Sequence, residues 1–153
     1  MPKLIHRFLR LTGGERRIVL EVAAALPATR IAMRIAGYSI CRTALARNAA
    51  AGKAHSDVAK AENAQKIARL ASVTASNLFF RSTCLEQSLV LCWVMRRRGF
   101  APLLRVGARK DVDRFEAHAW VELDGIVMGD VSGEHQHFTP FEEARVSLET
   151  QTH

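Results

Sequence analysis

Among the three cysteines of the chain, Cys84 has the local sequence that best suits a nucleophile. It lies between Thr83 and Glu86 in the Thr-x-x-Glu pattern of a capping box, which predicts a helix that begins at Cys84 with Thr83 as its N-cap. A thiol in the first turn of a helix faces the positive end of the helix dipole and free backbone N–H groups. Both favour the thiolate, and the N–H groups can also hold an oxyanion. A small buried residue near a helix end is the alternative, and we interpret Cys41 and Cys92 as such core residues.

His118 is the candidate base, because it lies on the polar side of an alternating segment. The segment from Phe115 to Leu123 is apolar at every second residue, which predicts a strand with His118 and Trp120 on its polar face. A histidine there is either a base held rigidly by the sheet or a surface histidine. The segment by itself leaves both interpretations open.

The turn after this strand decides which acid could orient His118. Asp124-Gly125 is a hairpin signal, followed by a returning strand at residues 126–130. A two-residue loop sets His118 opposite Val131, whereas a three-residue loop with a left-handed glycine sets Asp130 directly opposite His118. If Asp130 orients the base, the sequence therefore predicts the bulged, three-residue turn.

A nucleophile activated by a base, which an acid orients in turn, is the arrangement of acyl-transfer enzymes. Glu116 and Glu122 share the strand face of His118 and are fallback partners, or else solvated side chains. Donors to an oxyanion beyond the Cys84 backbone are not identified by pattern, and Asn77 and Arg81 are candidates only by their proximity in sequence.

Helical patterns precede these residues. Thr12-Gly13-Gly14-Glu15 is a second capping box, and its helix is expected to stop near Pro27. A second amphipathic segment carries Ile31, Ile35 and Tyr38 on one side. Residues 47–53 resemble a linker, and a third helix is expected after it. The third helix is assigned a cap at Ser56 or Asp57 and the apolar residues Val58, Ile67 and Leu70.

The pattern changes period after the helix of Cys84, which is expected to end at the arginines 96–98 and Gly99. Residues 103–109 read as a strand, and Thr139-Pro140-Phe141-Glu142 could open a short last helix. Helices first and an antiparallel sheet afterwards predict an α+β fold. We expect a single domain over residues 1–153, with a helical part to about residue 80, a catalytic core over 81–145 and a frayed tail over 146–153.

The amino-acid composition indicates which kinds of binding partner and which cellular compartment to expect. The excess of 22 basic over 15 acidic side chains gives a net charge of +7, which suits an acidic partner. Basic runs are not interleaved with aromatic residues, so we do not expect nucleic-acid binding. Charges interrupt each apolar run, and Glu21 interrupts a signal-like stretch near the N-terminus, so membrane contact is not expected. An odd number of cysteines favours reduced thiols in the cytoplasm.

The histidines also allow a metal site to be considered. His118, His135 and His137 could ligate a metal, and His-x-His spacing can do so from a strand. However, His135 and His137 fall among polar loop residues. No cofactor is expected.

Several stretches together resemble a known family, the transglutaminase-like leader peptidases of lasso-peptide biosynthesis (the peptidase part of the B protein). The Leu-Thr-Gly-Gly-Glu-Arg-Arg opening at residues 11–17 is similar as well, and Ala-His-Ala-Trp-Val-Glu at residues 117–122 is the most specific element. The matching stretches are Cys84-Leu85-Glu86-Gln87-Ser88-Leu89, Arg96-Arg97-Arg98-Gly99-Phe100, Val106-Gly107-Ala108-Arg109, Phe115-Glu116-Ala117-His118-Ala119-Trp120-Val121-Glu122 and Gly129-Asp130.

This resemblance implies a transglutaminase-like or papain-like fold and a triad of Cys84, His118 and Asp130. It also implies removal of the leader from a ribosomally made lasso-peptide precursor. A separate leader-recognition protein would deliver the leader, and a macrolactam-forming cyclase would act next. Gln87 departs from the family, which often has arginine there, and this affects any leader or partner contact at that position. Acyl transfer to an amine and a non-catalytic adaptor of the same fold are the alternatives.

Overall fold

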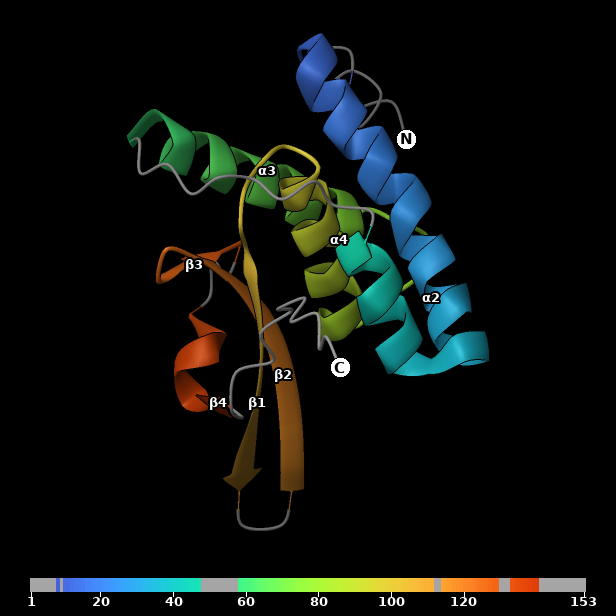
Figure 1. Cartoon of the computed structure of the whole chain (residues 1–153), viewed down its shortest axis with the longest axis vertical. Helices are drawn as coiled ribbons and strands as arrows, with labels where there is room; N and C mark the ends of the chain where they lie inside the picture. Colours follow the sequence, from blue (N-terminus) through green and yellow to red (C-terminus); the bar gives the residue numbers. More distant parts are fainter. Residues whose placement is uncertain (1–7, 9, 48–57, 112–113, 130–132, 141–153) are drawn as a thin grey trace, which may run out of the picture.

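The protein is described by a computed structural model that covers residues 8, 10–47, 58–111, 114–129 and 133–140. Within these ranges, three α-helices pack on a small antiparallel sheet of four strands in the order β3-β2-β1-β4 (Figure 1). The predicted α+β class is therefore confirmed. The elements are α2 (Gly13–Arg47), α3 (Val58–Ser76), α4 (Cys84–Arg96), β1 (Leu103–Asp111), β2 (Arg114–Leu123), β3 (Ile126–Met128), the 3₁₀ helix η1 (Glu134–His137) and β4 (Thr139–Pro140).

Helix α2 begins at the predicted capping box but does not end at Pro27. The backbone N–H of Thr12 donates to the Glu15 carboxylate at 2.7 Å, and the helix then runs through Pro27 to Arg47. Proline removes one helical hydrogen bond, but Leu26 and Thr29 on either side are buried, so packing keeps this stretch helical. The prediction that the helix stops near Pro27 is therefore wrong. The interruption lies instead at Gly37, where φ is 77° and ψ is 171°.

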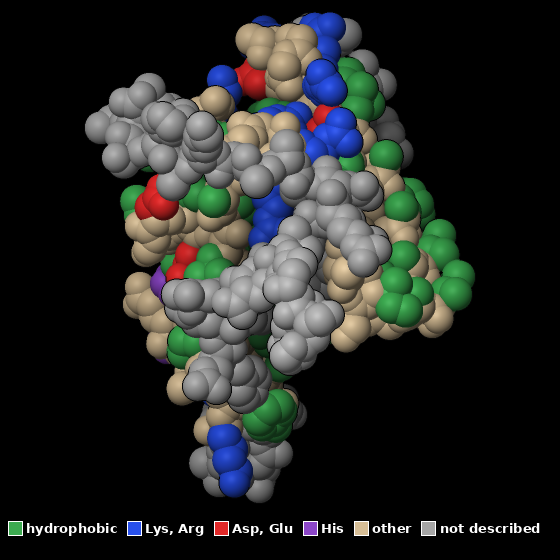
Figure 2. Space-filling model, viewed as in Figure 1, with side chains coloured by type: hydrophobic (Ala, Val, Ile, Leu, Met, Phe, Trp, Pro, Cys, Tyr) green, Lys and Arg blue, Asp and Glu red, His purple; other side chains and the backbone are tan. Residues whose placement is uncertain are grey.

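The outer face of α2 is apolar and exposed. Ile18, Val22 and Leu26 face the core, whereas Ile31 and Ile35 are 59% and 82% exposed. Figure 2 shows hydrophobic side chains gathered on the surface over this helix. Of the three apolar residues predicted on one side of the second segment, Tyr38 packs against the core while Ile31 and Ile35 are exposed, so that side is not buried as a whole.

Helix α4 has the predicted ends and lies at the centre of the molecule. Glu86 donates its backbone N–H to the Thr83 hydroxyl at 3.2 Å, and the Thr83 N–H donates to the Glu86 carboxylate at 2.8 Å, so the capping box is complete. Gly99 follows the last turn with φ 82°. Because α4 contacts both α2 and the sheet, its side chains are buried nearly all round (Leu89, Val90, Leu91, Cys92, Val94 and Met95).

The sheet is built on the β1–β2 hairpin, whose far end extends beyond the helices (Figure 1). Ala119, Val121 and Leu123 of β2 are buried, whereas Phe115 near the far end is 71% exposed. The apolar face predicted for this segment is therefore covered only along the half of β2 that lies against α4.

The turn between β2 and β3 is the two-residue kind. Leu123 pairs directly with Ile126, and both turn residues, Asp124 and Gly125, have positive φ values of 50° and 79°. The bulged, three-residue turn is therefore wrong. The ladder extends only to Met128, because Gly129 has a φ of 79° and leaves the strand conformation.

The segment before the described end of the chain also differs from the prediction. Thr139 and Pro140 form β4, which pairs with Ala108 and Gly107 of β1, whereas the rest of the expected last helix lies outside the described residues. Most of the expected linker lies outside the described residues, as do both candidate caps of the third helix, Ser56 and Asp57. None of the helices described is both long enough and apolar enough to cross a bilayer.

Candidate active site

The three cysteines have different surroundings, although all are free thiols. Cys84 is the first residue of α4 and is partly exposed, as its capping box predicts. Cys92 lies two turns later on the same helix, where burial raises the pKa of its thiol to about 12. Cys41 is buried in α2. The interpretation of Cys41 and Cys92 as core residues is confirmed, and Cys84 is the thiol that reagents can reach.

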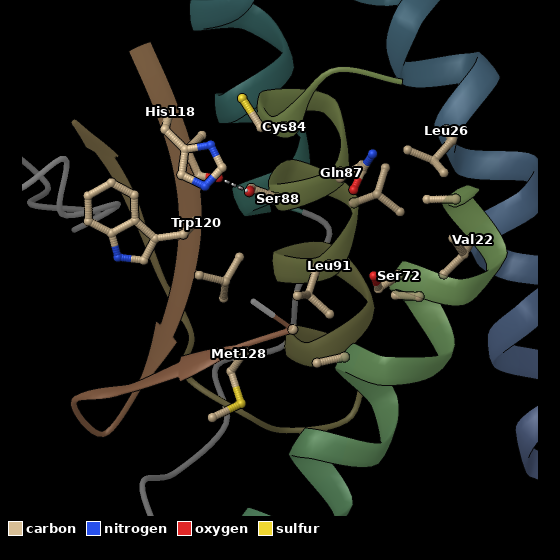
Figure 3. A pocket seen from close by; sticks show the side chains of 17 residues that line it. Val22, Leu26, Ser72, Cys84, Gln87, Ser88, Leu91, His118, Trp120 and Met128 are labelled. Atoms are coloured by element: carbon tan, nitrogen blue, oxygen red, sulfur yellow. Dashed lines mark hydrogen bonds between the residues drawn. The ribbon is translucent and has the colours of Figure 1, made fainter. Parts of the chain in front are cut away.

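Strand β2 packs against the first turns of α4 and carries His118. One turn after Cys84, the Ser88 hydroxyl donates to the backbone carbonyl of Ala119 at 3.0 Å, and this buried hydrogen bond holds α4 against β2. Cys84 and Ser88 are four residues apart and share a helix face, and His118 directly precedes Ala119. Figure 3 shows Cys84, at the start of α4, and His118, on β2, at the same end of a cavity that both residues line.

The cavity has a volume of about 140 Å³. Residues of α4 form its floor, β2 and β3 form one wall, and α3 with part of α2 forms the other (Figure 3). The residues that line it are Val22, Leu26, Ala68, Ala71, Ser72, Ala75, Cys84, Gln87, Ser88, Val90, Leu91, His118, Ala119, Trp120, Val121, Met128 and Gly129. Neither Asn77 nor Arg81, the oxyanion candidates, is among them.

Aromatic side chains position the imidazole of His118. The Trp120 ring is stacked at 6.1 Å between centroids with an interplanar angle of 19°, and the Phe138 ring lies at 5.1 Å. Trp120 is buried although it was placed on the polar face, and its indole N–H donates to Glu122 at 2.9 Å. Glu122 in turn accepts a hydrogen bond from Arg105 at 3.0 Å. The ring beside His118 is thus fixed by packing and by a charged hydrogen-bond network.

Gly107 makes room for this arrangement, and sequence reasoning missed it. It lies directly opposite His118 on β1. A Cβ at this position would lie 2.9 Å from the Trp120 ring and 2.8 Å from the Thr139 carbonyl oxygen. The signal was a glycine inside an otherwise regular strand, which often marks a close approach.

The two fallback acids bind arginines of β1 instead of His118. Glu122 pairs with Arg105, and Glu116 pairs with Arg109, across the β1–β2 ladder. Both carboxylates are partly buried ion-pair partners, so neither is the orienting acid nor a merely solvated side chain.

Asp130 lies outside the described residues, so its role as the acid stays a prediction. The register argument that linked it to a bulged turn assumed a regular strand through residue 130. Because Gly129 leaves the strand conformation, counting along the ladder no longer specifies which residue faces His118.

The histidines do not assemble with other ligand-type residues in the described part of the chain. Both His118 and His135 lie near the Trp120 ring, at 6.1 and 6.3 Å between centroids, and His137 is exposed. Within the described ranges, no group of three His, Cys, Asp or Glu side chains is close enough to hold a metal ion.

Comparison with known proteins places this arrangement in a family. The family model described as the transglutaminase-like superfamily matches residues 22–143, a range that includes every residue lining the cavity. Searches of curated proteins and of solved structures gave no significant match. The match spans far more than half of the chain and agrees with a helix-borne cysteine packed on an antiparallel sheet. The chain therefore belongs to the transglutaminase-like superfamily.

Proposed function

We propose that the protein is a cysteine peptidase, with Cys84 as the nucleophile and His118 as its base. The observation that carries this proposal is that both side chains line the same end of one cavity. The Ser88–Ala119 hydrogen bond keeps their two elements in contact, and Cys84 lies at the start of a capped helix. Transglutaminase-like membership supports cysteine-based acyl transfer.

In the proposed reaction, His118 accepts the proton of the Cys84 thiol, and the thiolate attacks the carbonyl carbon of a peptide bond. The backbone N–H groups of the first turn of α4 stabilise the oxyanion. Protonated His118 then gives its proton to the leaving amine, which produces a thioester. A water molecule, deprotonated by His118, hydrolyses the thioester and restores the thiol.

Asp130 completes the proposed triad as the acid that orients His118. A carboxylate there would accept the N–H of the imidazole and keep the other ring nitrogen available to the thiol. This assignment rests on the resemblance of Gly129-Asp130 to the leader peptidases. Aromatic packing already limits the ring's movement, so the acid would serve mainly to select the tautomer.

The proposed substrate is the leader region of a lasso-peptide precursor. The support is the match of residues 84–89, 117–122 and 129–130 to that family's motifs. A separate recognition protein is proposed to present the leader, and a cyclase to close the macrolactam afterwards. We place the reaction in the cytosol, since all three cysteines are free and cytosolic thiols stay reduced.

The test is cleavage of the candidate precursor in the presence of the recognition protein, followed by mass spectrometry. Cys84→Ala and His118→Ala are each expected to lower the cleavage rate at least about 1,000-fold. Cys41→Ala and His137→Ala are the matched controls, because they make the same changes outside the cavity, and they are expected to retain cleavage. Asp130→Asn is expected to lower the rate while leaving the fold intact.

Three results would each contradict part of this proposal. Cleavage by the Cys84→Ala variant would show that Cys84 is not the nucleophile. Formation of an amide with an added amine, in preference to hydrolysis, would establish a transglutaminase-type reaction. Stable complex formation by the wild-type protein, without cleavage, would favour the adaptor.

A further inference from the structure

The cavity beside Cys84 extends well beyond the reacting groups. Cys84, Ser88 and Leu91 are spaced four and three residues apart on one face of α4, so the floor continues along the helix for about 10 Å from the thiol. Met128 of β3 and Gly129, which follows it, also line the cavity. A substrate held at Cys84 could therefore place a neighbouring side chain in this space.

Small side chains on α3 keep the space open. Ala68, Ala71, Ser72 and Ala75 line the wall opposite β2, at positions three and four residues apart on one helix face. Larger residues at the same level, such as Val22 and Leu26, are almost fully buried in the core. The volume of about 140 Å³ is comparable to that of an engineered cavity that binds benzene.

Apart from Cys84 and His118, the described residues that line the cavity carry no ionisable side chain. Among the lining residues of the described chain, none is Asp, Glu, Lys or Arg. The Ser88 hydroxyl is engaged by the Ala119 carbonyl, and the Gln87 amide donates to Ser82. A charged side chain that entered would lose its hydration without gaining an ionic partner.

We propose that this cavity is the binding site for a compact apolar side chain of the peptide whose carbonyl Cys84 attacks. The proposal rests on the proposed peptidase function and adds the chemical class that the enzyme selects. Burial of an aliphatic group of about four carbons fills the space between Leu91, Met128 and Ala71 and removes apolar surface from water.

Thiol labelling tests the cavity without requiring cleavage. Alkyl methanethiosulfonates react with the Cys84 thiolate to form a disulfide, and methanesulfinate leaves with the electrons of the broken S–S bond. The n-butyl reagent is compared with the similarly long sulfonatoethyl and trimethylammonioethyl reagents, which carry opposite charges. Each rate is measured by peptide-resolved mass spectrometry and divided by the rate with a free model thiol. We expect n-butyl to label Cys84 at least about tenfold faster than either charged reagent.

Variants of the α3 wall identify the site of this preference. Ala71→Leu places a larger side chain in the cavity from a buried position, and Ser72→Leu does so from a partly exposed position. Because Ser72 is partly exposed, Ser72→Leu is the variant expected to fold even if Ala71→Leu does not. Both are expected to bring the n-butyl rate to within about threefold of the charged reagents. Val73→Leu is the control, because Val73 lies on the same helix with half of its surface exposed, outside the cavity, and it should keep the preference.

Equal normalised rates in the wild-type protein would overturn the proposal, and so would a preference that persists in both filled variants. These outcomes do not depend on whether the precursor is cleaved. A wild-type protein that labels with the expected preference and cleaves nothing would contradict the peptidase and leave the apolar site in place.

Discussion

The position of the His118 imidazole depends on a glycine of the neighbouring strand β1. Gly107 lies opposite His118 and leaves room for the Trp120 ring, which stacks beside the imidazole. A methyl group at position 107 would clash with the backbone oxygen of Thr139 as well as with the Trp120 ring. A shift of only one of these two groups would therefore not relieve the clash.

We therefore expect Gly107→Ala to shift Trp120 and to lower kcat at least about tenfold, because a small displacement of a base is costly. The measurement is the cleavage rate together with the near-ultraviolet circular dichroism of the tryptophans. Ala108→Ser is the control on the next residue of β1, which is partly exposed. Unchanged kcat in a folded Gly107→Ala protein would show that the ring position does not control the base.

The cysteines give a second prediction at this scale. Because burial raises the pKa of Cys92 to about 12, this thiol is neutral and shielded at pH 8, and Cys41 is buried too. One equivalent of iodoacetamide per protein is expected to modify Cys84 at least about tenfold faster than either of the others. Peptide mapping after timed quenching measures the three rates. Modification of Cys92 at a similar rate would mean that α4 opens to solvent.

The sequence predicted the local settings of Cys84 and His118, a helix start and a strand, because a capping box and an alternating strand are local patterns. The roles of the two residues as nucleophile and base stay predictions. The partners of Glu116 and Glu122 could not be found in this way, because they lie on β1 and depend on the strand register. The orienting acid could not be fixed by register either, because a single left-handed residue, Gly129, ends the ladder.

At the scale of elements, α4 and α2 begin with the same kind of cap, and this permits a matched comparison. Thr83→Ala and Thr12→Ala each remove the hydroxyl of a Thr-x-x-Glu box. Each is expected to lower the free energy of unfolding by about 1 kcal/mol, as measured by urea denaturation.

Only Thr83→Ala is expected also to slow the modification of Cys84 and to lower the cleavage rate, because it loosens the turn that carries the thiol. If Thr12→Ala lowers the cleavage rate as much as Thr83→Ala does, the loss in both variants results from lower global stability. Timed labelling of both variants at one temperature separates the two explanations.

The predicted element boundaries were right where capping residues determine them. They were wrong where tertiary packing determines them. The start of α2 and both ends of α4 followed from capping residues and Gly99. Pro27 did not end α2, because the residues around it are buried against the other helices. Similarly, Thr139 and Pro140 pair with the edge of β1 as a short strand, a tertiary contact that no local pattern indicates.

For the molecule as a whole, ion pairs connect α2 with α3 and with the segment that follows α4. Lys66 of α3 donates to Glu15 of α2, and Glu21 of α2 binds Arg98, which follows α4. The Lys66 ammonium beside Glu15, together with hydrogen bonds from Thr12, lowers the pKa of this carboxyl to about 2.

This pKa has a consequence for acid stability. Because the folded pKa of Glu15 lies below its unfolded value of 4.5, the carboxylate stabilises the protein above about pH 4.5, and that contribution is lost as the pH falls toward 2. Glu15→Gln is therefore expected to be less stable than wild type at pH 7 and equally stable near pH 2. Urea denaturation at pH 7, 3.5 and 2 measures this, with Glu62→Gln, an exposed acid on α3, as control. A difference that stays constant with pH would contradict it.

The α+β class was predictable because the period of the apolar pattern changes once, after Gly99. The way in which α2 and α3 pack beside α4 was not, because apolar residues occur on more than one face of α2. The cavity itself could not be predicted from the sequence, since it arises where the alanines of α3 meet side chains of α2, α4, β2 and β3.

The α3 wall gives this protein a simple route to diverge. Cys84 and His118 lie on α4 and β2, whereas Ala71 and Ser72 come from a different helix. If the proposed peptidase and its apolar site hold, single mutations on α3 change which substrates are accepted while Cys84 and His118 stay where they are. Gene duplication followed by exchange of these small residues would then yield proteins of the same proposed chemistry with different preferences.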